Sequence, residues 1–339
     1  MMKKVLIVVL TIAMIFSLFI SFSACGKKLD SIVVAVPDGA PALGMSYLMK
    51  EYPTEIDGVK VTYKIVDGTT GIRAAVSSGE ADFAIMPTNM AATLYNGGLD
   101  IRVAGTNCYG LLYMISNQEG EFSLDSLKGQ VLHTIGQGGT PEAVLKMILD
   151  ANQIEYVESK EAVAGKVALR FYGDGKEIIA SLPTGNIQYA ILGEPAVSNA
   201  IQKVNTFSVV YDLQEGWMLA TGTDTGYPQT SLIVKGSLAK SEEALVTTIA
   251  KLTLQGSNAL KEDASPYVAF LKEKGVTVNA NGVDRANIDP TFGGQAKKDI
   301  SAYLTILNSF KPALIGGKMP DDNFYYNSTD LEVINAFGK

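Results

Sequence analysis

Histidine and cysteine are scarce in this chain of 339 residues, which has one histidine, His133, and two cysteines, Cys25 and Cys108. A metal centre with several histidine and cysteine ligands is therefore excluded, and a Ser-His-Asp triad would require His133. His133 lies in an apolar run before a glycine loop, so we expect it to be structural. Cys108 lies beside apolar segments, and we expect a buried thiol there. No metal or other cofactor is predicted.

Arginine is also scarce, because the chain has only Arg73, Arg102, Arg170 and Arg285. The net charge is −7 at pH 7 and no basic face is evident, which excludes nucleic acid as a partner. Doubly charged anions are commonly bound by arginine forks. None of the four arginines lies in the loops where a ligand is expected, so the sequence favours a neutral or weakly charged ligand.

The N-terminal segment has the pattern of an export signal. Lys3 and Lys4 precede residues 5–22, which carry no charge, and small residues follow before Cys25. Residues 22–25 resemble the bacterial lipobox, which is a hydrophobic residue, two small residues and a cysteine. That resemblance implies diacylglycerol on the Cys25 thiol and cleavage before it. The alternative is a retained membrane helix, because the apolar run approaches the roughly 20 residues that span a bilayer.

The lipoprotein interpretation divides the start of the chain into two parts. Residues 1–24 form a signal peptide, and residues 25–30 form a tether whose acyl chains, such as palmitate, hold the protein on the membrane. We therefore expect a lipid-anchored protein on the extracytoplasmic face of the cell membrane. About 315 residues then remain, a length that suits two domains.

Strand-like and helix-like runs alternate along most of the remaining chain. Strands are predicted at residues 31–36, 59–66, 81–86 and 101–105, and again at residues 130–135, 166–171, 188–192 and 207–211. Helices are predicted between them, and long helices follow at residues 241–261, 265–274 and 295–310. This order predicts an α/β fold with mostly parallel sheets covered on both faces, followed by a helical C-terminal region.

The two halves of this pattern resemble each other. Residues 72–86 align without gaps on residues 178–192, with Gly79 on Gly185, although two helix-turn-strand units can also match by chance. A repeat would give two lobes with equivalent loops. Ligands of such sheets bind outside the carboxyl ends of the strands, so the loops of both lobes would line one cleft.

Two strand-like segments are expected to join the lobes, at residues 108–116 and 227–234. Lobe 1 then comprises residues 31–108 and 227–339, and lobe 2 comprises residues 109–226. Two crossings restrict relative motion to bending and twisting, which suits hinge closure on a ligand.

The loop at residues 136–141 carries the sharpest local motif, Gly-Gln-Gly-Gly-Thr-Pro. Gly138 and Gly139 permit close approach of a ligand to the backbone. Thr140 is a favourable N-cap and is followed by a proline, so free amides at this helix start would attract an anion or a polar ring atom. The alternative is a plain strand-to-helix turn. The spacing matches neither a dinucleotide fingerprint nor a Walker loop.

Other polar residues follow the predicted strands. Glu194 is expected to accept a hydrogen bond from a ring N–H or an amine, and Tyr227 to supply a flat face. The predicted ligand-binding residues are Asp38, Gly39, Thr88, Asn89, Thr106, Gly138, Gly139, Thr140, Glu194 and Tyr227. They favour a heterocyclic solute that is neutral or weakly charged.

Residues 78–85, 138–145 and 192–196 resemble the solute-binding proteins of ABC importers, in the branch with nitrate, sulfonate, taurine and pyrimidine-precursor receptors. The resemblance covers about residues 31–235. It implies a two-lobed fold of the type II periplasmic-binding-protein kind, which closes as a monomer on one small-molecule solute. It also implies docking on an ABC permease powered by a separate ATPase, without enzymatic activity.

Two alternatives to solute transport stay open. Pyrimidine-forming synthases share this fold, and fold does not fix function. The single histidine and the lack of a catalytic constellation argue against an enzyme. The other alternative is a ligand-sensing lipoprotein that uses the same cleft.

Overall fold

The computed structural model describes residues 29–328 and Leu331. The predicted signal peptide, Cys25 and most of the predicted tether lie outside the described residues. Within the part that is described, no helix has both the length and the apolar character needed to cross a membrane. From Ile32 onward the chain forms one compact unit, and the description below concerns that unit.

The first sheet has six strands in the order β2-β3-β1-β4-β12-β5. Its strands are β1 (Ser31–Pro37), β2 (Glu55–Ile56), β3 (Val59–Val66), β4 (Phe83–Pro87), β5 (Ile101–Tyr109) and β12 (Pro228–Lys235). Strands β1 and β4 are parallel, whereas β12 runs antiparallel to both of its neighbours, β4 and β5. Strands β4 and β5 therefore point the same way with β12 between them.

The second sheet also has six strands, in the order β11-β6-β10-β7-β9-β8. Its strands are β6 (Leu112–Ser116), β7 (Val131–Ile135), β8 (Tyr156–Glu158), β9 (Val167–Tyr172), β10 (Tyr189–Gly193) and β11 (Ser208–Asp212). The pairs β10–β7, β7–β9 and β8–β9 are parallel. Strand β6 is antiparallel to β10 and β11. The prediction of mostly parallel sheets is confirmed by the repeating units, whereas β2, β6 and β12 run antiparallel to their neighbours.

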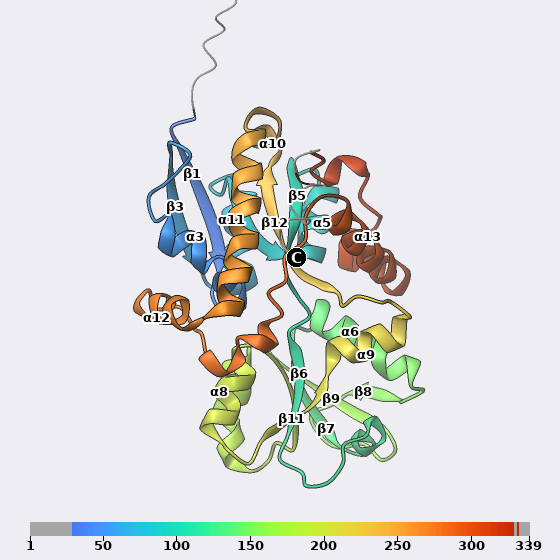
Figure 1. The fold of residues 1–339 in the computed structure, drawn as a ribbon. Coiled ribbons are helices and arrows are strands. Elements are labelled where there is room, and N and C mark those ends of the chain that lie inside the picture. The colour runs from blue at the N-terminus through green and yellow to red at the C-terminus, as the bar shows by residue number, and fades with distance from the viewer. Residues whose placement is uncertain (1–28, 329–330, 332–339) are drawn as a thin grey trace, which may run out of the picture. The chain divides into compact units, whose positions relative to one another are not determined.

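Strands β6 and β12, which run antiparallel to their neighbours, carry the chain between the sheets (Figure 1). Strand β5 ends at Tyr109, and β6 begins at Leu112, which pairs with Gly193 at the carboxyl end of β10. A chain that leaves the carboxyl end of β5 thus enters the second sheet beside the carboxyl end of β10. The carboxyl ends of the parallel strands in the two sheets therefore face each other.

The strand sequences match their positions in the sheets. All of residues 83–86 in β4 are buried, as expected for a strand with helices on both faces. Strand β3 lies farther toward the edge of the same sheet, and there Val59 and Val61 are buried while Lys60 and Thr62 are exposed. That alternation is typical of a strand with one solvated face.

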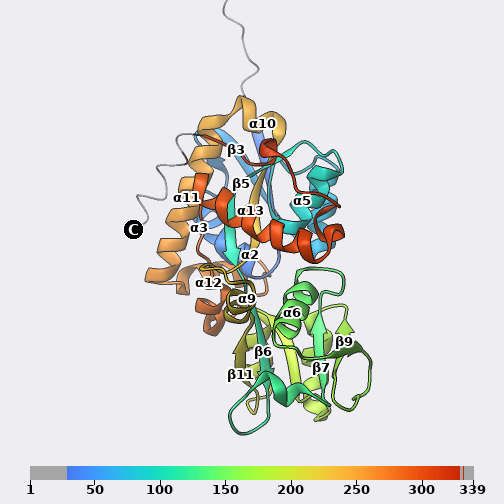
Figure 2. The ribbon, with the colours of Figure 1, turned by 90° about the vertical axis from the view of Figure 1, so that its right-hand side faces the viewer.

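Helices cover both sheets. Those beside the first sheet are α2 (Ala40–Gly44), α3 (Ser46–Glu51), α4 (Gly68–Ser77), α5 (Thr88–Asn96), α10 (Gly236–Ser241), α11 (Glu243–Glu262), α12 (Ser265–Glu273) and α13 (Gly293–Phe310). Those beside the second are α6 (Thr140–Ala151), α7 (Gly175–Ser181), α8 (Ala196–Lys203) and α9 (Leu213–Thr221). Helices α3 and α11 lie to one side of the first sheet and α5 and α13 to the other (Figure 1). Helix α6 contacts α13 (Figure 2).

Short 3-10 turns complete the secondary structure, at Leu124–Leu127, Leu182–Thr184, Ala280–Gly282, Asp284–Ala286, Pro312–Ile315 and Asp322–Phe324. Two of these turns, Ala280–Gly282 and Asp284–Ala286, lie in the α12–α13 linker, residues 274–292. We call the first sheet with its helices the first half of the molecule, and the second sheet with α6, α7, α8 and α9 the second half. The linker leaves α12, packs on α8 of the second half and returns to α13. It therefore joins the two halves by side-chain contacts, in addition to the two strand crossings.

Candidate functional site

The loop after β1 meets the loop after β10. Gly39 has a φ of 97°, a backbone conformation that favours glycine because a side chain is strained there. A β-carbon placed on Gly39 would lie 3.4 Å from Cδ of Pro195. The predicted loops of the two halves are thus in close contact at this point.

The hydroxyl of Thr140, in the second half, bonds to side chains of the first half. Thr140 Oγ1 donates to Asn89 Oδ1 at 3.3 Å and lies 2.9 Å from the hydroxyl of Tyr303. Asn89 Nδ2 in turn donates to the Leu314 carbonyl. The first turns of α5 and α6 and the middle of α13 therefore meet at Thr140.

The helix starts differ from the predicted capping by one residue. The N-cap of α6 is Gly139, in an extended conformation, and Thr140 is the first helical residue. Its hydroxyl makes no cap bond and is available to the other half of the molecule. Thr88 likewise begins α5, and its buried hydroxyl lies 2.8 Å from that of Ser231.

An aromatic cluster lies behind Thr140. The ring of Tyr303 stacks on Tyr227 with centroids 6.0 Å apart, and Trp217 meets both rings edge-on. Tyr227 is fully buried, and its hydroxyl has no hydrogen-bond partner among the described residues. Burial raises the pKa of Tyr227 well above its usual value, so this hydroxyl is a neutral group.

The two charged candidates, Glu194 and Asp38, are both bonded to the α12–α13 linker. Glu194 is 5% exposed, and its Oε1 accepts hydrogen bonds from Arg285 Nε at 2.6 Å and Ser198 Oγ at 3.0 Å. Asp38 Oδ1 accepts from the backbone N–H of Thr277 at 2.6 Å. These carboxylates therefore stabilise the linker, a role that no local sequence pattern indicates.

Thr106 and Gly138 are also engaged in internal contacts. Thr106 lies within β5, not after it as predicted, and its hydroxyl accepts from the N–H of Thr291 at 2.7 Å. The N–H of Gly138 donates to the Glu142 carboxylate. Burial alone would raise the pKa of Glu142, but this bond and Lys146 together lower it. The amide of Gly138 is therefore used within its own loop.

His133 and Cys108 are structural. Burial lowers the pKa of His133 to about 4, and Arg170 acts in the same direction, while its Nδ1 lies 2.9 Å from the Tyr172 hydroxyl. Cys108 is a free, buried cysteine, and burial raises its pKa to about 12. The prediction of a buried thiol is confirmed. Across residues 29–328, no group of three or more His, Cys, Asp or Glu residues could hold a metal ion.

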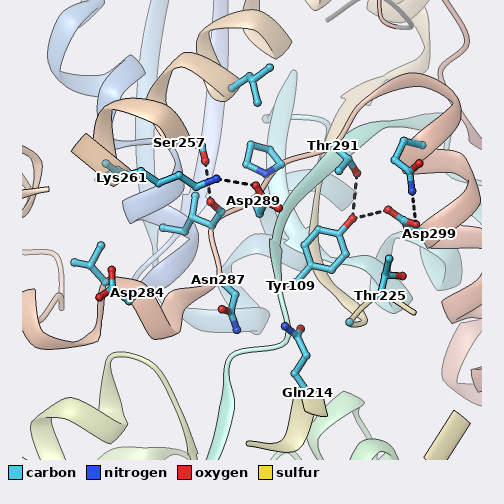
Figure 3. A pocket seen from close by; sticks show the side chains of 17 residues that line it. Tyr109, Gln214, Thr225, Ser257, Lys261, Asp284, Asn287, Asp289, Thr291 and Asp299 are labelled. Atoms are coloured by element: carbon cyan, nitrogen blue, oxygen red, sulfur yellow. Dashed lines mark hydrogen bonds and ion pairs between the residues drawn. The ribbon is translucent and has the colours of Figure 1, made fainter. Parts of the chain in front are cut away.

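A cavity of about 1140 Å³ lies beside the crossings. None of its lining residues is a predicted ligand-binding residue, although Tyr109 and Gly226 are close in sequence to Thr106 and Tyr227. Tyr109, Gln214 and Gly226 line it together with residues of α11, α13 and the linker (Figure 3). Sequence reasoning could not find it, because its walls come from six separate parts of the chain and no local motif links them.

Comparisons with known proteins place the fold. No family model matches the sequence, and no curated protein matches it. A solved ABC transporter protein from Parabacteroides distasonis superposes with a TM-score of 0.74 at 24% identity, covering 87% of this chain and 98% of that one.

Two sulfonate-binding proteins also share the fold. The periplasmic aliphatic sulphonate binding protein of Escherichia coli has a TM-score of 0.66 at 12% identity, covering 88% of this chain and 92% of its own. The alkanesulfonate-binding protein of Xanthomonas axonopodis, bound to MOPS, has a TM-score of 0.57 at 11% identity, with 84% and 95% covered. The chain therefore has the α/β fold of periplasmic binding proteins, with two sheets whose loops face each other.

Proposed function

We propose that this protein is the solute-binding component of an ABC importer. It captures a small organic solute between the carboxyl-end loops of its two sheets and delivers it to a permease with a separate ATPase. The observation that carries the proposal is the bond from Thr140 to Asn89, which joins two helix starts from opposite halves. In a hinged fold such facing helix starts close on a ligand, and the solved proteins of the same fold include an ABC transporter protein and a periplasmic sulphonate-binding protein.

The chemistry of these loops favours a neutral, planar solute. Asn89, Thr140, Tyr227 and Tyr303 offer an amide, three hydroxyls and stacked rings. The side chain of Arg285 is bonded to Glu194. A sulfonate would need strong cationic donors, so this protein differs in ligand from the sulfonate-binding proteins that share its fold.

We also propose that the protein is a non-catalytic, monomeric lipoprotein, anchored through Cys25 on the extracytoplasmic face of the membrane. Mass spectrometry of the membrane-bound protein should find acyl chains on Cys25 as the new N-terminus. Cys25→Ser should abolish both the acylation and the cleavage, so that the variant keeps residues 1–24. A wild-type chain that keeps residues 1–24 and carries no acyl chains would contradict the lipid anchor and favour a retained helix.

Thermal unfolding in the presence of candidate solutes tests the binding proposal, because a ligand that binds only the folded state raises the unfolding temperature. The candidates are uracil, cytosine, thymine, taurine and nitrate. We expect at least one planar heterocycle to raise the midpoint and the two anions to have no effect. A shift with taurine or nitrate alone would contradict the neutral-solute proposal.

A matched pair of variants locates the site. Thr140→Val removes the hydroxyl that faces Asn89 and should weaken binding of the heterocycle by about tenfold, the effect of one lost hydrogen bond to a buried partner. Thr54→Val changes an exposed threonine and should leave binding unchanged. Equal affinities in the two variants would remove Thr140 from the site.

A further inference from the structure

The cavity beside the crossings has a lining unlike that of the carboxyl-end loops. Tyr109 ends β5 and Gly226 precedes β12, so two of its residues belong to the segments that connect the sheets, and Gln214 lies in the first turn of α9. Helices α11 and α13 and the linker supply the other walls (Figure 3). Its volume of about 1140 Å³ is ample for a small organic molecule.

One wall of this cavity carries a buried carboxylate with no cationic partner. Asp299 is 5% exposed. Its Oδ2 accepts from the Tyr109 hydroxyl at 2.7 Å, and its Oδ1 accepts from Gln295 Nε2 at 2.8 Å. Within the described residues, no lysine or arginine nitrogen lies within 4.0 Å of it. Buried charges are ordinarily paired, so Asp299 is a position where a cation would be stabilised.

The rest of the lining reinforces the negative charge. Asp284 lies on the opposite side of the cavity from Asp299 in Figure 3 and makes no ion pair within the described residues. Asp289 pairs with Lys261 at 2.9 Å. Three carboxylates therefore face one ammonium group. Oε1 of Gln214 is also buried and accepts no hydrogen bond from the described residues, which adds a neutral acceptor beside the crossings.

We propose that this cavity is a second ligand site, which binds an organic diamine. One ammonium group bonds to Asp299, and the other end of the molecule points toward Asp284. Neutral Tyr109 and Gln295 hold the Asp299 carboxylate in position, and the apolar stem contacts Leu254 and Leu260 of α11. The site is distinct from the Thr140 contact. It accepts a cationic ligand, whereas the Thr140 contact accepts a neutral solute.

Isothermal titration calorimetry of the purified protein with 1,4-diaminobutane tests this site. The length-matched controls are 1,4-butanediol, which is neutral, and succinate, which is anionic. We expect saturable binding of the diamine only. No saturable binding of the diamine, or equal binding of the diol, would overturn the proposal.

Three variants assign the binding to the cavity. Asp299→Asn keeps the shape of the side chain and should weaken diamine binding by about tenfold or more, as expected when one member of a buried charge pair is removed. Asp284→Asn, nearer the solvent, should weaken it by about threefold. Asp125→Asn removes an exposed carboxylate on another part of the molecule and should have no effect.

If Asp299→Asn fails to fold, as monitored by thermal unfolding, Asp284→Asn against Asp125→Asn decides the question. Unchanged diamine affinity in every folded cavity variant would overturn the assignment. Because the heterocycle titration depends on Thr140 and not on Asp299, failure of this proposal is distinguishable from failure of the proposed transport function.

Discussion

Two of the contacts between the halves of the molecule differ in polarity. The neutral contact consists of Asn89, Thr140 and Tyr303, which exchange hydrogen bonds between uncharged groups. The charged contact consists of Glu194, Ser198 and Arg285, where a buried carboxylate meets a guanidinium group. Neutral bonds are weak and readily exchanged for bonds to a solute. Breaking a buried ion pair is costly, so the charged contact is suited to holding the chain in place.

Arg285→Ala tests the charged contact and should have the largest effect. The substitution leaves the Glu194 carboxylate, whose side chain is 1% exposed, without its cation. Because the arginine itself is partly exposed, we expect a loss of about 2–3 kcal/mol in the free energy of unfolding, measured by urea denaturation. Adding Glu194→Gln to this variant should restore part of the loss. A loss as small as that of a surface pair would show that the linker does not depend on this bond.

Acidification tests whether His133, on the strand that precedes the Thr140 loop, must stay uncharged. His133 lies on β7, and its pKa is lowered from 6.5 to about 4 chiefly by burial. Because the unfolded state binds the proton more tightly, this group's contribution is complete above pH 6.5 and is lost between pH 6.5 and about 4.

Urea denaturation at pH 7 and pH 4.5 measures this contribution. The protein should lose roughly 2 kcal/mol more stability over that interval than His133→Asn. The variant lacks this titration but keeps the other acidic groups, so it is the matched control. Equal losses in the two proteins would show that His133 is not held neutral by the fold.

Two glycines separate the effect of backbone strain from the effect of the contact between the loops after β1 and β10. Gly39 has a φ of 97° and lies next to Pro195, whereas Gly79 has a φ of 75° and faces open space. Valine should cost about 1–2 kcal/mol of stability through backbone strain at Gly79 and at least as much at Gly39, whose ψ of −143° lies in a region essentially restricted to glycine. Only Gly39→Val should also weaken binding of the heterocycle in calorimetry. Similar affinities in both variants would exclude the Gly39–Pro195 contact from closure.

Tyr227→Phe should have the smallest effect on stability. The hydroxyl that it removes is buried and has no hydrogen-bond partner in the part of the chain that the structure describes, so the free energy of unfolding should be unchanged or should rise by up to about 1 kcal/mol. Affinity for the heterocycle should fall if the unpartnered hydroxyl serves the solute. Unfolding and titration of the same variant measure both, and a clear loss of stability would show that the hydroxyl has a structural partner.

The regular part of the fold was predictable from local patterns. Strand β3 was expected at residues 59–66 and is found at Val59–Val66, because alternation of apolar and polar residues is a local property. Gly79 and Gly185 were aligned in the sequence, and both have a φ of 75° between a helix and a strand. The direction of β6 and β12 was not predictable, since it depends on how the chain passes between sheets.

The candidate site was predictable only where both partners lay in similar loops. Asn89 and Thr140 were both selected as helix-start residues, and they meet. Arg285 was not linked to Glu194, because 91 residues separate them and neither lies in a periodic pattern that includes the other. No sequence pattern indicates Asp299 as a ligand-binding residue. It lies within a helix, and its burial depends on Tyr109, another distant residue.

The position of β12 determines the order in which the two sheets can be completed. All strands of the second sheet lie in one continuous stretch, from Leu112 of β6 to Asp212 of β11. The first sheet stays divided until Pro228–Lys235 enters between β4 and β5. A chain that emerges from its N-terminus, from a ribosome or across a membrane, can therefore assemble the later sheet before the earlier one is closed.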